Sequence, residues 1–411
     1  MREAYIVESV RTPGCKRAKG LLSQVRPEDI IKAALAGVME RSGVPKEAVE
    51  DVMCGCAFPE AEQGLNVGRI ATLMAGFPDT VCGATINRFC SSGLEAIAIS
   101  SMRIIAGMAD VTIGAGLESM SIVPMGGNLI RPHPEWAKSD PDVYIGMGMT
   151  AENVARRYNV TREDQDYFAM HSHMKAAKAQ KECWFKEIVP VESYKFVQQP
   201  DGSFKRETFK ADYDDGVKGD TTVETISKLR GAFAAPNPKI PNSGSVTAAN
   251  SSQTTDGAAA TLIMCKEACE KYSVKPKFKF NGYVVAGCKA DEMGVGPAVA
   301  IPKLFTKTGI NMDTIKKDGL IELNEAFAAQ GIYCCRELGI GDRKYFETDS
   351  PDLIINPTGG AIALGHPLGC SGAKITATLF MNMERLNKKY GIVSMCIGGG
   401  MGAAALFERV N

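Results

Sequence analysis

The chain has 411 residues, with 47 basic and 47 acidic side chains, so its formal net charge at pH 7 is zero. Its length predicts two or three domains, and its composition of 45% hydrophobic and 23% charged residues is ordinary for a globular protein. The balanced charge argues against a nucleic-acid partner, which needs a basic excess or a basic face. No apolar run approaches the roughly 18 residues of a membrane span.

The cysteines and the termini indicate the compartment. The thirteen cysteines are an odd number at irregular spacings, without a Cys-x-x-Cys pair. This favours free thiols in a reducing compartment over a disulfide framework or a metal site. The N-terminus carries no secretory or transit pattern, and the C-terminus lacks a Ser-Lys-Leu ending. We therefore expect a cytoplasmic protein without a bound metal.

The first part of the chain alternates strand and helix patterns. Residues 4–10 and 80–87 are predicted strands, residues 91–106 a predicted helix, and residues 111–113 a buried strand. A further helix is predicted at Pro27, after which apolar residues recur at helical spacing. This βα alternation predicts a parallel or mixed sheet with helices on its faces.

The composition changes between residues 121 and 245, where Pro, Gly, Asp and Lys cluster and one clear helix is predicted at residues 162–181. We interpret this stretch as an inserted region that covers a site. Alternation then returns, with predicted strands at residues 256–265, 277–288, 320–324, 353–356 and 392–397.

A weak internal repeat links the two ends of the chain. Residues 87–93 (NRFCSSG) lead into a helix, a strand and Gly-Ala-Gly. Residues 369–373 (GCSGA) lead into a helix, a strand and Gly-Gly-Gly. The shared order predicts a duplicated α/β unit; the alternative is a chance likeness of two βαβ units.

Cys90 is the first candidate catalytic residue. It lies between a predicted strand and a predicted helix, with small residues directly after it. A helix N-terminus offers unpaired N–H groups and the positive end of the macrodipole, which stabilise a thiolate. The alternative is a buried cysteine that caps the helix.

His366 is the second candidate. It lies in a glycine-rich segment, residues 356–369 (NPTGGAIALGHPLG), and Pro367 fixes the turn after it. Such a segment is a poor place to bury an imidazole for packing and a good one to direct it into a cleft. The other histidines, His133, His171 and His173, have no comparable setting.

Cys396 ends an apolar strand and precedes residues 398–402 (GGGMG), whose backbone N–H groups can stabilise an oxyanion. A dinucleotide-binding fingerprint is the competing interpretation, but no βαβ unit follows it in the chain. Asn324 begins residues 324–328 (NEAFA) at a strand-to-helix junction. Its side chain can hold a water, orient an imidazole, or simply cap a helix.

Taken in order, the motifs around Cys90, Asn324, His366 and Cys396 resemble the thiolase family over nearly the whole chain. The resemblance implies two βαβαβαββ halves in a five-layer α/β/α/β/α core, assembled as a dimer or tetramer. The expected domains are an N-terminal half (1–121 plus 247–274), a loop domain over a coenzyme A site (122–246) and a C-terminal half (275–411).

The resemblance also implies the chemistry. His366 would activate Cys90, whose thiolate attacks the 3-keto carbon of a 3-oxoacyl-CoA, and Cys396 would protonate the departing acetyl-CoA enolate. Coenzyme A is then a substrate, and no permanently bound cofactor is expected. One oxyanion hole would combine His366 with a water held by Asn324, and a second the N–H groups of Cys90 and Gly398.

Five further residues are carried over as binding residues. Arg230 and Ser252 align with positions near the nucleotide and the pantetheine. Met147, Ala326 and Phe327 would line the pantetheine–acyl channel.

The branch of the family is predicted from one position. Members that form acetoacetyl-CoA usually have a histidine before the Met-Gly of this loop, whereas this chain has Gly146. This favours a 3-ketoacyl-CoA thiolase of fatty-acid degradation. The glycines after Cys396 are in the form common among biosynthetic members, so an acetyl-CoA acetyltransferase is the alternative.

Two other classes of protein share this fold. A decarboxylating condensing enzyme typically lacks a second reactive cysteine, which Cys396 supplies. A non-catalytic lipid carrier or scaffold on the same fold should have lost a site residue, and none is missing.

Overall fold

The computed structural model describes residues 2–233 and 244–410. The strands of its main sheet are β1 (Tyr5–Arg11), β2 (Cys15–Lys16), β3 (Asp51–Gly55), β4 (Cys82–Ile86), β5 (Val111–Ser119), β8 (Thr255–Met264), β9 (Phe278–Gly287), β10 (Gly319–Leu323), β11 (Tyr390–Ile397) and β12 (Met401–Arg409). They are arranged in the order β10-β11-β12-β9-β1-β8-β5-β3-β4, and β2 pairs with β8. The predicted α/β class with a mixed sheet is confirmed.

The sheet consists of two halves that meet where β1 and β9 share two residue pairs, Tyr5 with Lys279 and Ile6 with Phe278. In the N-terminal half, β3, β4 and β5 are parallel, and β8 runs antiparallel between β5 and β1. In the C-terminal half, β10 and β11 are parallel, and β12 runs antiparallel between β11 and β9. The predicted duplication is therefore present in the strand order.

The outer edges of the two halves differ. β4 is a complete edge strand, whereas the corresponding place beside β10 holds a single bridge between Ile321 and Ile355. The predicted strand at residues 353–356 is therefore wrong. Asn356 has a φ of 46°, and this left-handed conformation ends the extended backbone.

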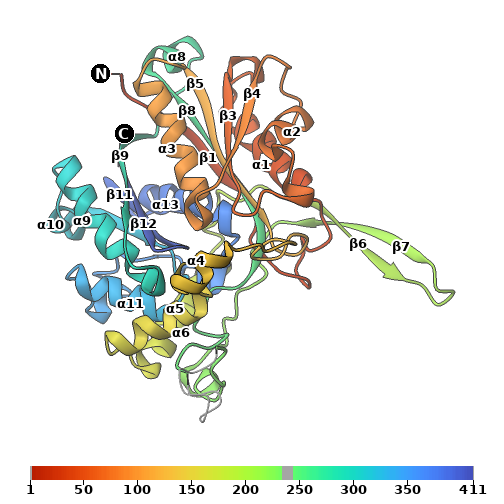
Figure 1. Ribbon diagram of the computed structural model, residues 1–411. Coiled ribbons are helices and arrows are strands. Elements are labelled where there is room, and N and C mark those ends of the chain that lie inside the picture. The colour runs from red at the N-terminus through yellow and green to blue at the C-terminus, as the bar shows by residue number, and fades with distance from the viewer. Residues whose placement is uncertain (1, 234–243, 411) are drawn as a thin grey trace.

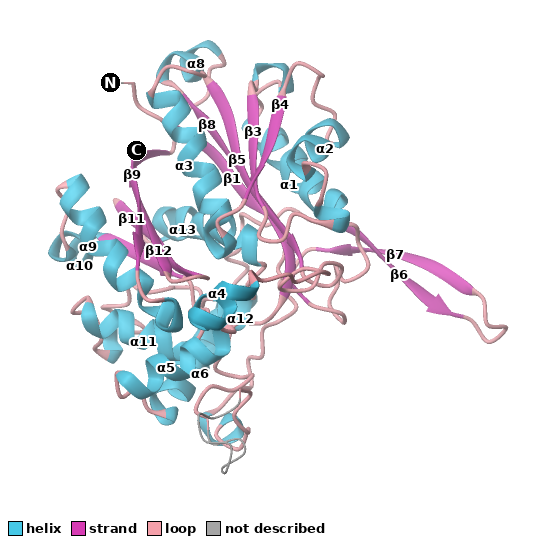
Figure 2. Ribbon diagram, in the orientation of Figure 1, coloured by secondary structure: helices cyan, strands magenta, loops and turns pink. Residues whose placement is uncertain are grey.

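The helices that pack around the two sheet halves include α1 (Pro27–Ser42), α2 (Val67–Met74), α3 (Ser92–Ile105), α9 (Gly296–Thr308), α10 (Met312–Asp318), α11 (Ala328–Glu337) and α13 (Ser371–Arg385). α3 and α13 pack against each other between the two sheet halves, α1 covers the far face of the N-terminal half, and α9 covers that of the C-terminal half. Figures 1 and 2 show the resulting layers, α/β/α/β/α. Within the described ranges, no helix is both long and apolar enough to cross a membrane.

Two glycines allow the central helices to approach. A Cβ on Gly93 would lie 2.7 Å from the backbone N of Ala373, and one on Gly372 would lie 2.3 Å from that of Leu94. The two glycines occupy matched positions in the two halves, and each contacts the helix of the other half. Both distances are too short for any side chain, so glycine is required for this packing.

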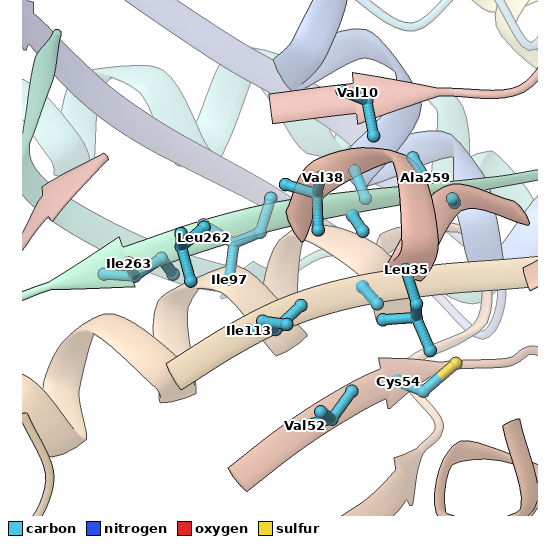
Figure 3. Packing of buried hydrophobic residues seen from close by; sticks show 14 of the residues in the cluster. Val10, Leu35, Val38, Val52, Cys54, Ile97, Ile113, Ala259, Leu262 and Ile263 are labelled. Carbon is cyan, nitrogen blue, oxygen red and sulfur yellow. The ribbon is translucent and has the colours of Figure 1, made fainter. Parts of the chain in front are cut away.

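α1 illustrates how the sequence determines the core. Pro27 occupies the first turn, where its missing N–H costs nothing, and Gly43 ends the helix with a φ of 70°. The apolar residues that recur at helical spacing are buried against the sheet. Figure 3 shows Leu35 and Val38 over Ile113 of β5 and its neighbours on β8. Each such side chain contributes about 1.5–3 kcal/mol by leaving water.

The inserted region between β5 and β8 contains α4 (Pro134–Ser139), α5 (Met147–Arg157), α6 (Arg162–Lys181), α7 (Val223–Ile226) and the hairpin of β6 (Val191–Gln198) and β7 (Phe204–Ala211). The helix predicted at residues 162–181 is confirmed at both ends. The hairpin, which Figure 1 shows projecting from the body, was not predicted. Its charged and polar residues hide the strand alternation.

Candidate active site

Cys90 lies on a 3₁₀ turn, η3 (Phe89–Ser91), between β4 and α3. Phe89 has a φ of 43°, an uncommon conformation for a residue with a side chain. The turn is held by Asn87 Oδ1, which accepts from Phe89 N at 2.8 Å, and by the ion pair of Arg88 with Glu95 at 2.6 Å. The fold thus fixes Cys90 at the start of α3, with its side chain buried.

The electrostatics of Cys90 combine two opposing effects. Burial raises the pKa of its thiol to about 12, while the backbone N–H groups of Gly398 and of Cys90 itself act to lower that pKa. Gly398 comes from the turn between β11 and β12 and lies against Phe89. The structure therefore brings two predicted residues, Cys90 and Gly398, together from opposite halves. Without substrate the sulfur is a neutral thiol facing two N–H groups.

His366 follows a short helix, α12 (Ala361–Leu364), and Gly365, whose φ is 81°. Its backbone N donates to Gln253 O at 3.0 Å and to Thr255 Oγ1 at 3.1 Å. Its imidazole is only 4% exposed, and it lines the cavity described below. The glycines let the chain pass tightly through the interior, because at Gly365 a Cβ would lie 2.3 Å from Thr255 Oγ1.

Burial and a nearby cation keep this imidazole neutral. Desolvation lowers the pKa of His366 to about 3, and the buried ammonium of Lys374 acts in the same direction. Lys374 Nζ donates to Leu364 O at 3.0 Å and to Gly365 O at 3.3 Å, so it also holds the segment that leads to the histidine. The imidazole is therefore neutral, with one ring nitrogen that can accept a proton.

Asn324 follows β10 and lies beside His366, with its Nδ2 3.4 Å from Nε2 of the imidazole. Its Oδ1 is buried and has no hydrogen-bond partner among the described residues. Because a buried amide oxygen usually has a partner, this atom suits a bound water. The next residue, Glu325, braces the site by accepting hydrogen bonds from Ser172 Oγ at 2.6 Å, Asn356 Nδ2 at 2.8 Å and Ile362 N at 3.2 Å.

Cys396 is fully buried near the end of β11 and packs with Met293 and Ala326. Burial raises the pKa of its thiol well above the usual range, and the neighbouring Cys90 thiol adds to this. The turn after it needs glycine at Gly400, where φ is 85° and a Cβ would lie 2.5 Å from the backbone O of Cys288. The two thiols therefore approach each other from different halves of the molecule.

A cavity of about 140 Å³ lies beside His366, and it is lined by Met120, Met125, Met147, Gly148, Phe233, Ser251, Ser252, Gln253, Thr254, Ala326, Phe327, His366 and Leu368. Met147 packs against the residues around Cys90 and also against those around Cys396. The lining is mainly apolar, with the imidazole as its titratable group. Such a cavity suits an acyl chain or a pantetheine arm.

Four of the five predicted binding residues, Met147, Ser252, Ala326 and Phe327, lie on this cavity. Arg230 is exposed and does not line it, so its role stays a prediction. Sequence reasoning missed several wall residues, among them Met120, Phe233, Gln253 and Leu368. The one available signal was the polar run at residues 250–255 directly before an apolar strand.

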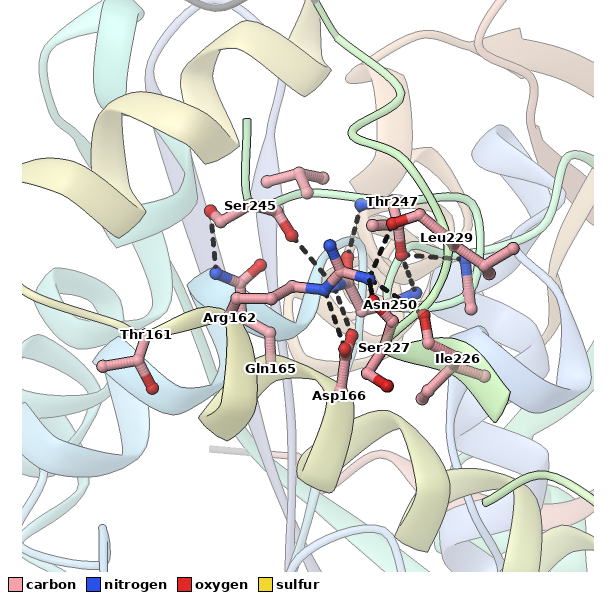
Figure 4. Close-up of polar contacts among 12 residues, drawn as sticks. Thr161, Arg162, Gln165, Asp166, Ile226, Ser227, Leu229, Ser245, Thr247 and Asn250 are labelled. Carbon is pink, nitrogen blue, oxygen red and sulfur yellow. Dashed lines mark hydrogen bonds and ion pairs between the residues drawn. The ribbon is translucent and has the colours of Figure 1, made fainter. Parts of the chain in front are cut away.

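The polar run is anchored to α6 by a buried network that Figure 4 shows. Asn250 Nδ2 donates to Asp166 Oδ1 at 2.9 Å and to Ser245 O at 3.1 Å. Arg162 pairs with the same carboxylate at 2.7 Å. The inserted region thereby fixes the wall formed by residues 251–254, which places Ser252 and Gln253 at the cavity.

A thiol under two N–H groups, a neutral imidazole and a second buried thiol form a site suited to acyl transfer through a cysteine. Comparison with known families gives the class a name. The family model described as "Thiolase, N-terminal domain" matches residues 4–267, and "Thiolase, C-terminal domain" matches residues 274–409. The chain belongs to the thiolase family.

Relatives and solved structures agree with this assignment. The 3-ketoacyl-CoA thiolase of Bacillus subtilis (strain 168) is 46% identical over 99% of this chain and 100% of its own length. An acetyl-CoA acetyltransferase of Bacillus anthracis is 34% identical with a TM-score of 0.84, covering 100% of this chain and 99% of its own. The dimeric peroxisomal thiolase of Saccharomyces cerevisiae is 34% identical with a TM-score of 0.83, covering 99% and 98%.

Proposed function

We propose that this chain is a 3-ketoacyl-CoA thiolase, which cleaves 3-oxoacyl-CoA with coenzyme A and forms an acyl-cysteine on the way. The observation that carries the proposal is that His366 lines an apolar cavity and that Cys90 and Cys396 both pack against residues of its wall. The naming of the Bacillus subtilis relative supports the same activity.

In the first half of the reaction, His366 takes the proton of Cys90, and the thiolate attacks the 3-keto carbon. The C2–C3 bond then breaks, and its electron pair leaves with acetyl-CoA as an enolate. Cys396 gives its proton to C2 of that enolate. The proton held by His366 then restores Cys396, so both groups are again neutral when acetyl-CoA has left.

In the second half, the thiol of coenzyme A gives its proton to His366, and its sulfur attacks the acyl-cysteine. The tetrahedral intermediate collapses, and the departing thiolate of Cys90 recovers the proton from His366. Because the acyl group is held on the enzyme between two substrates, the reaction follows ping-pong kinetics.

The thioester oxygens need donors when charge develops on them. The N–H groups of Cys90 and Gly398 face the nucleophile and form one oxyanion hole in this proposal. His366, once protonated at Nε2, and a water on Asn324 Oδ1 form the other; the unpartnered amide oxygen supports this. Loss of one such donor typically costs about 10²–10³ in rate.

Gly146 supports the longer-chain branch. It is the residue before α5, with a φ of −65° that any residue adopts, and a Cβ there would meet no atom within 4 Å. Neither backbone nor packing therefore requires glycine. Gly146 is exposed, and the next residue, Met147, lines the cavity that would receive the acyl group. The acetyl-CoA acetyltransferase of similar fold keeps acetoacetyl-CoA as a second candidate substrate.

The direct test is to trap the intermediate. Purified enzyme is mixed with a medium-chain 3-oxoacyl-CoA without free coenzyme A. We expect a burst of acetyl-CoA and an acyl mass increment on the peptide that contains Cys90, which added coenzyme A removes. Cys90→Ala should form no adduct. A burst with acetoacetyl-CoA alone would indicate the acetyltransferase. Folded enzyme that cleaves neither substrate would indicate a carrier or scaffold.

We also propose a homodimer or homotetramer in the cytoplasm. β4 is an edge strand with largely half-exposed residues, and such edges are usually covered in native proteins. A second copy added along β4 would cover it. Sedimentation equilibrium at a multiple of 44.0 kDa would support this assembly, and a mass of 44.0 kDa at working concentration would oppose it.

A further inference from the structure

The first residue of α13, Ser371, lies behind the imidazole of His366. Its Oγ contacts Nδ1 of the ring and also lies 2.9 Å from Pro367 O. A carbonyl oxygen can only accept, so the single hydroxyl proton of Ser371 is directed to Pro367 O. The contact with the ring must then be made by an N–H on Nδ1, with Ser371 Oγ as the acceptor.

The N-terminal half contains the same serine in a different bonding pattern. Ser92 is the first residue of α3, and its Oγ donates to Phe89 O at 2.7 Å. Its acceptor side is occupied by the backbone N–H of Arg88 at 2.8 Å. The residue at the place of Arg88 is Pro367, which has no N–H. The lone pair of Ser371 is therefore free for a side chain, and His366 uses it.

The contact of the other ring nitrogen, Nε2, also indicates that the proton is on Nδ1. Nε2 of His366 faces Nδ2 of Asn324 at 3.4 Å, and an amide N–H can only donate. Nε2 is therefore the unprotonated ring nitrogen, and its lone pair faces the amide N–H of Asn324. If the ring carried its proton on Nε2, the two N–H groups would oppose each other, and Asn324 would have to turn its oxygen away from the water site.

We propose that Ser371 is a positioning residue that holds His366 as the Nδ1–H tautomer, so that Nε2 keeps the lone pair that takes protons from Cys90 and coenzyme A. This role rests on the proposed thiolase function. Lys374 assists it, because its ammonium holds the carbonyls of Leu364 and Gly365 and disfavours a second proton on the resting ring. Free imidazole side chains populate both neutral tautomers, so the serine contact removes an unproductive one.

The spectroscopic test uses the fact that the chain has four histidines. With ¹⁵N-histidine labelling, the signals that vanish in His366→Asn identify His366. We expect Nδ1 of the wild type to show the shift of a protonated ring nitrogen and Nε2 that of an unprotonated one. Ser371→Ala should move the two shifts toward each other as both tautomers become populated. An Nε2–H signal in the wild type, or shifts unchanged in Ser371→Ala, would overturn the proposal.

The kinetic test compares two hydroxyls on one helix. Thr376 Oγ1 is also buried in α13 and donates to the carbonyl four residues earlier, Gly372 O, at 2.7 Å, but it does not touch His366. We expect Ser371→Ala to lower kcat roughly 10- to 100-fold with little change in KM, and Thr376→Val to keep kcat near wild type. Ser371→Thr, which keeps the hydroxyl, should recover most of the rate. Equal losses in Ser371→Ala and Thr376→Val would mean a general packing effect and overturn the role.

The tautomer measurement needs no turnover. A wild type with the expected shifts but no cleavage of 3-oxoacyl-CoA would therefore refute the proposed function while leaving the hydrogen bond intact. Cleavage without the expected shifts would refute the role of Ser371 alone.

Discussion

In the N-terminal half of the molecule, the turn before the central helix carries Cys90; in the C-terminal half the same turn, η7 (Leu368–Cys370), has Gly369 at that place and Cys370 one residue later. Cys370 is buried in the main core, whereas Cys90 packs against Met120 and Leu368, which line the cavity. Both are 3₁₀ turns directly before a central helix, but their backbones differ: Arg88 has a φ of −133° and a ψ of 46°, whereas Pro367 at the matched position has −72° and 99°. A duplicated fold thus supplies matched positions around one centre, and side-chain substitutions divide the chemistry between them.

The edges of the halves show a second divergence. The N-terminal half completes its sheet with β4, while the C-terminal half reduces that strand to the bridge at Ile355. The chain that follows Ile355 instead runs through Asn356 and α12 to His366. In the C-terminal half, the segment between this bridge and η7 therefore carries the imidazole.

The largest effect on activity is expected when the cysteines of the two matched turns, Cys90 and Cys370, are replaced in turn. Cys90→Ala should lower kcat by at least about 10⁴-fold, because the group that carries the acyl chain is gone. The matched variant Cys370→Ala should keep its turnover and lose about 1 kcal/mol of stability from the core. Thiolysis rates with circular dichroism as the folding control measure both. If Cys370→Ala were folded but inactive, the assignment of Cys90 and not Cys370 as the nucleophile would be wrong.

A smaller effect, on stability, is expected when the buried ion pairs of Arg11 are removed. Arg11 of β1 is fully buried and pairs with Asp214 at 2.8 Å and with Glu187 at 2.9 Å, and Glu187 accepts from Thr378 of α13 at 3.0 Å. Arg11→Met would leave buried carboxylates without their cation, and we expect a loss of about 3–5 kcal/mol in the free energy of unfolding.

The control for Arg11 is a surface ion pair of similar length, Arg26 with Glu28 at 2.7 Å, in which the arginine is 53% exposed. Arg26→Met should cost at most about 1 kcal/mol. Denaturant titration of both variants gives the comparison. Equal losses would show that the buried cluster contributes nothing beyond a solvated contact.

The third prediction concerns pH. Burial lowers the pKa of His366 from 6.5 to about 3, so between these values the unfolded chain binds a proton that the folded chain does not. The free energy of unfolding therefore falls as pH falls through this window. From pH 7.5 to 5 the contribution lost should be about 2 kcal/mol. Unfolding of His366→Asn should depend less on pH by this amount; parallel curves would contradict a buried neutral imidazole.

The smallest effect is expected on substrate preference, and it tests whether Gly146 of the inserted region influences the acyl chain length. Gly146→His adds a side chain, without backbone strain, directly before Met147, which lines the cavity. The ratio of kcat/KM for medium-chain substrate to that for acetoacetyl-CoA should fall about 10-fold, the size expected when a pocket loses apolar contact. Gly202→His, on the hairpin turn where a Cβ also meets nothing but φ is 85°, is the control for an added imidazole. An unchanged ratio would remove Gly146 from the chain-length argument.

The sequence by itself determined the α/β class, the duplication and the principal chemical groups. Helical spacing after Pro27 and strand alternation survive in any context, because they reflect which face of each element leaves water. The glycine-rich segments around His366 and Cys396 could be recognised in the sequence as sites of tight backbone packing, because only glycine permits such a close approach of backbone. Arg230 is exposed and lies outside the cavity, and its predicted place near the nucleotide stays a prediction.

Tertiary structure decided the rest. Burial of His366, the N–H of Gly398 at Cys90 and the bond from His366 to Ser371 all depend on segments far apart in the chain or on the direction of a single proton. No local pattern encodes these. The same serine begins both central helices, and only the folded neighbours, Arg88 with its N–H or Pro367 without one, determine what that serine binds.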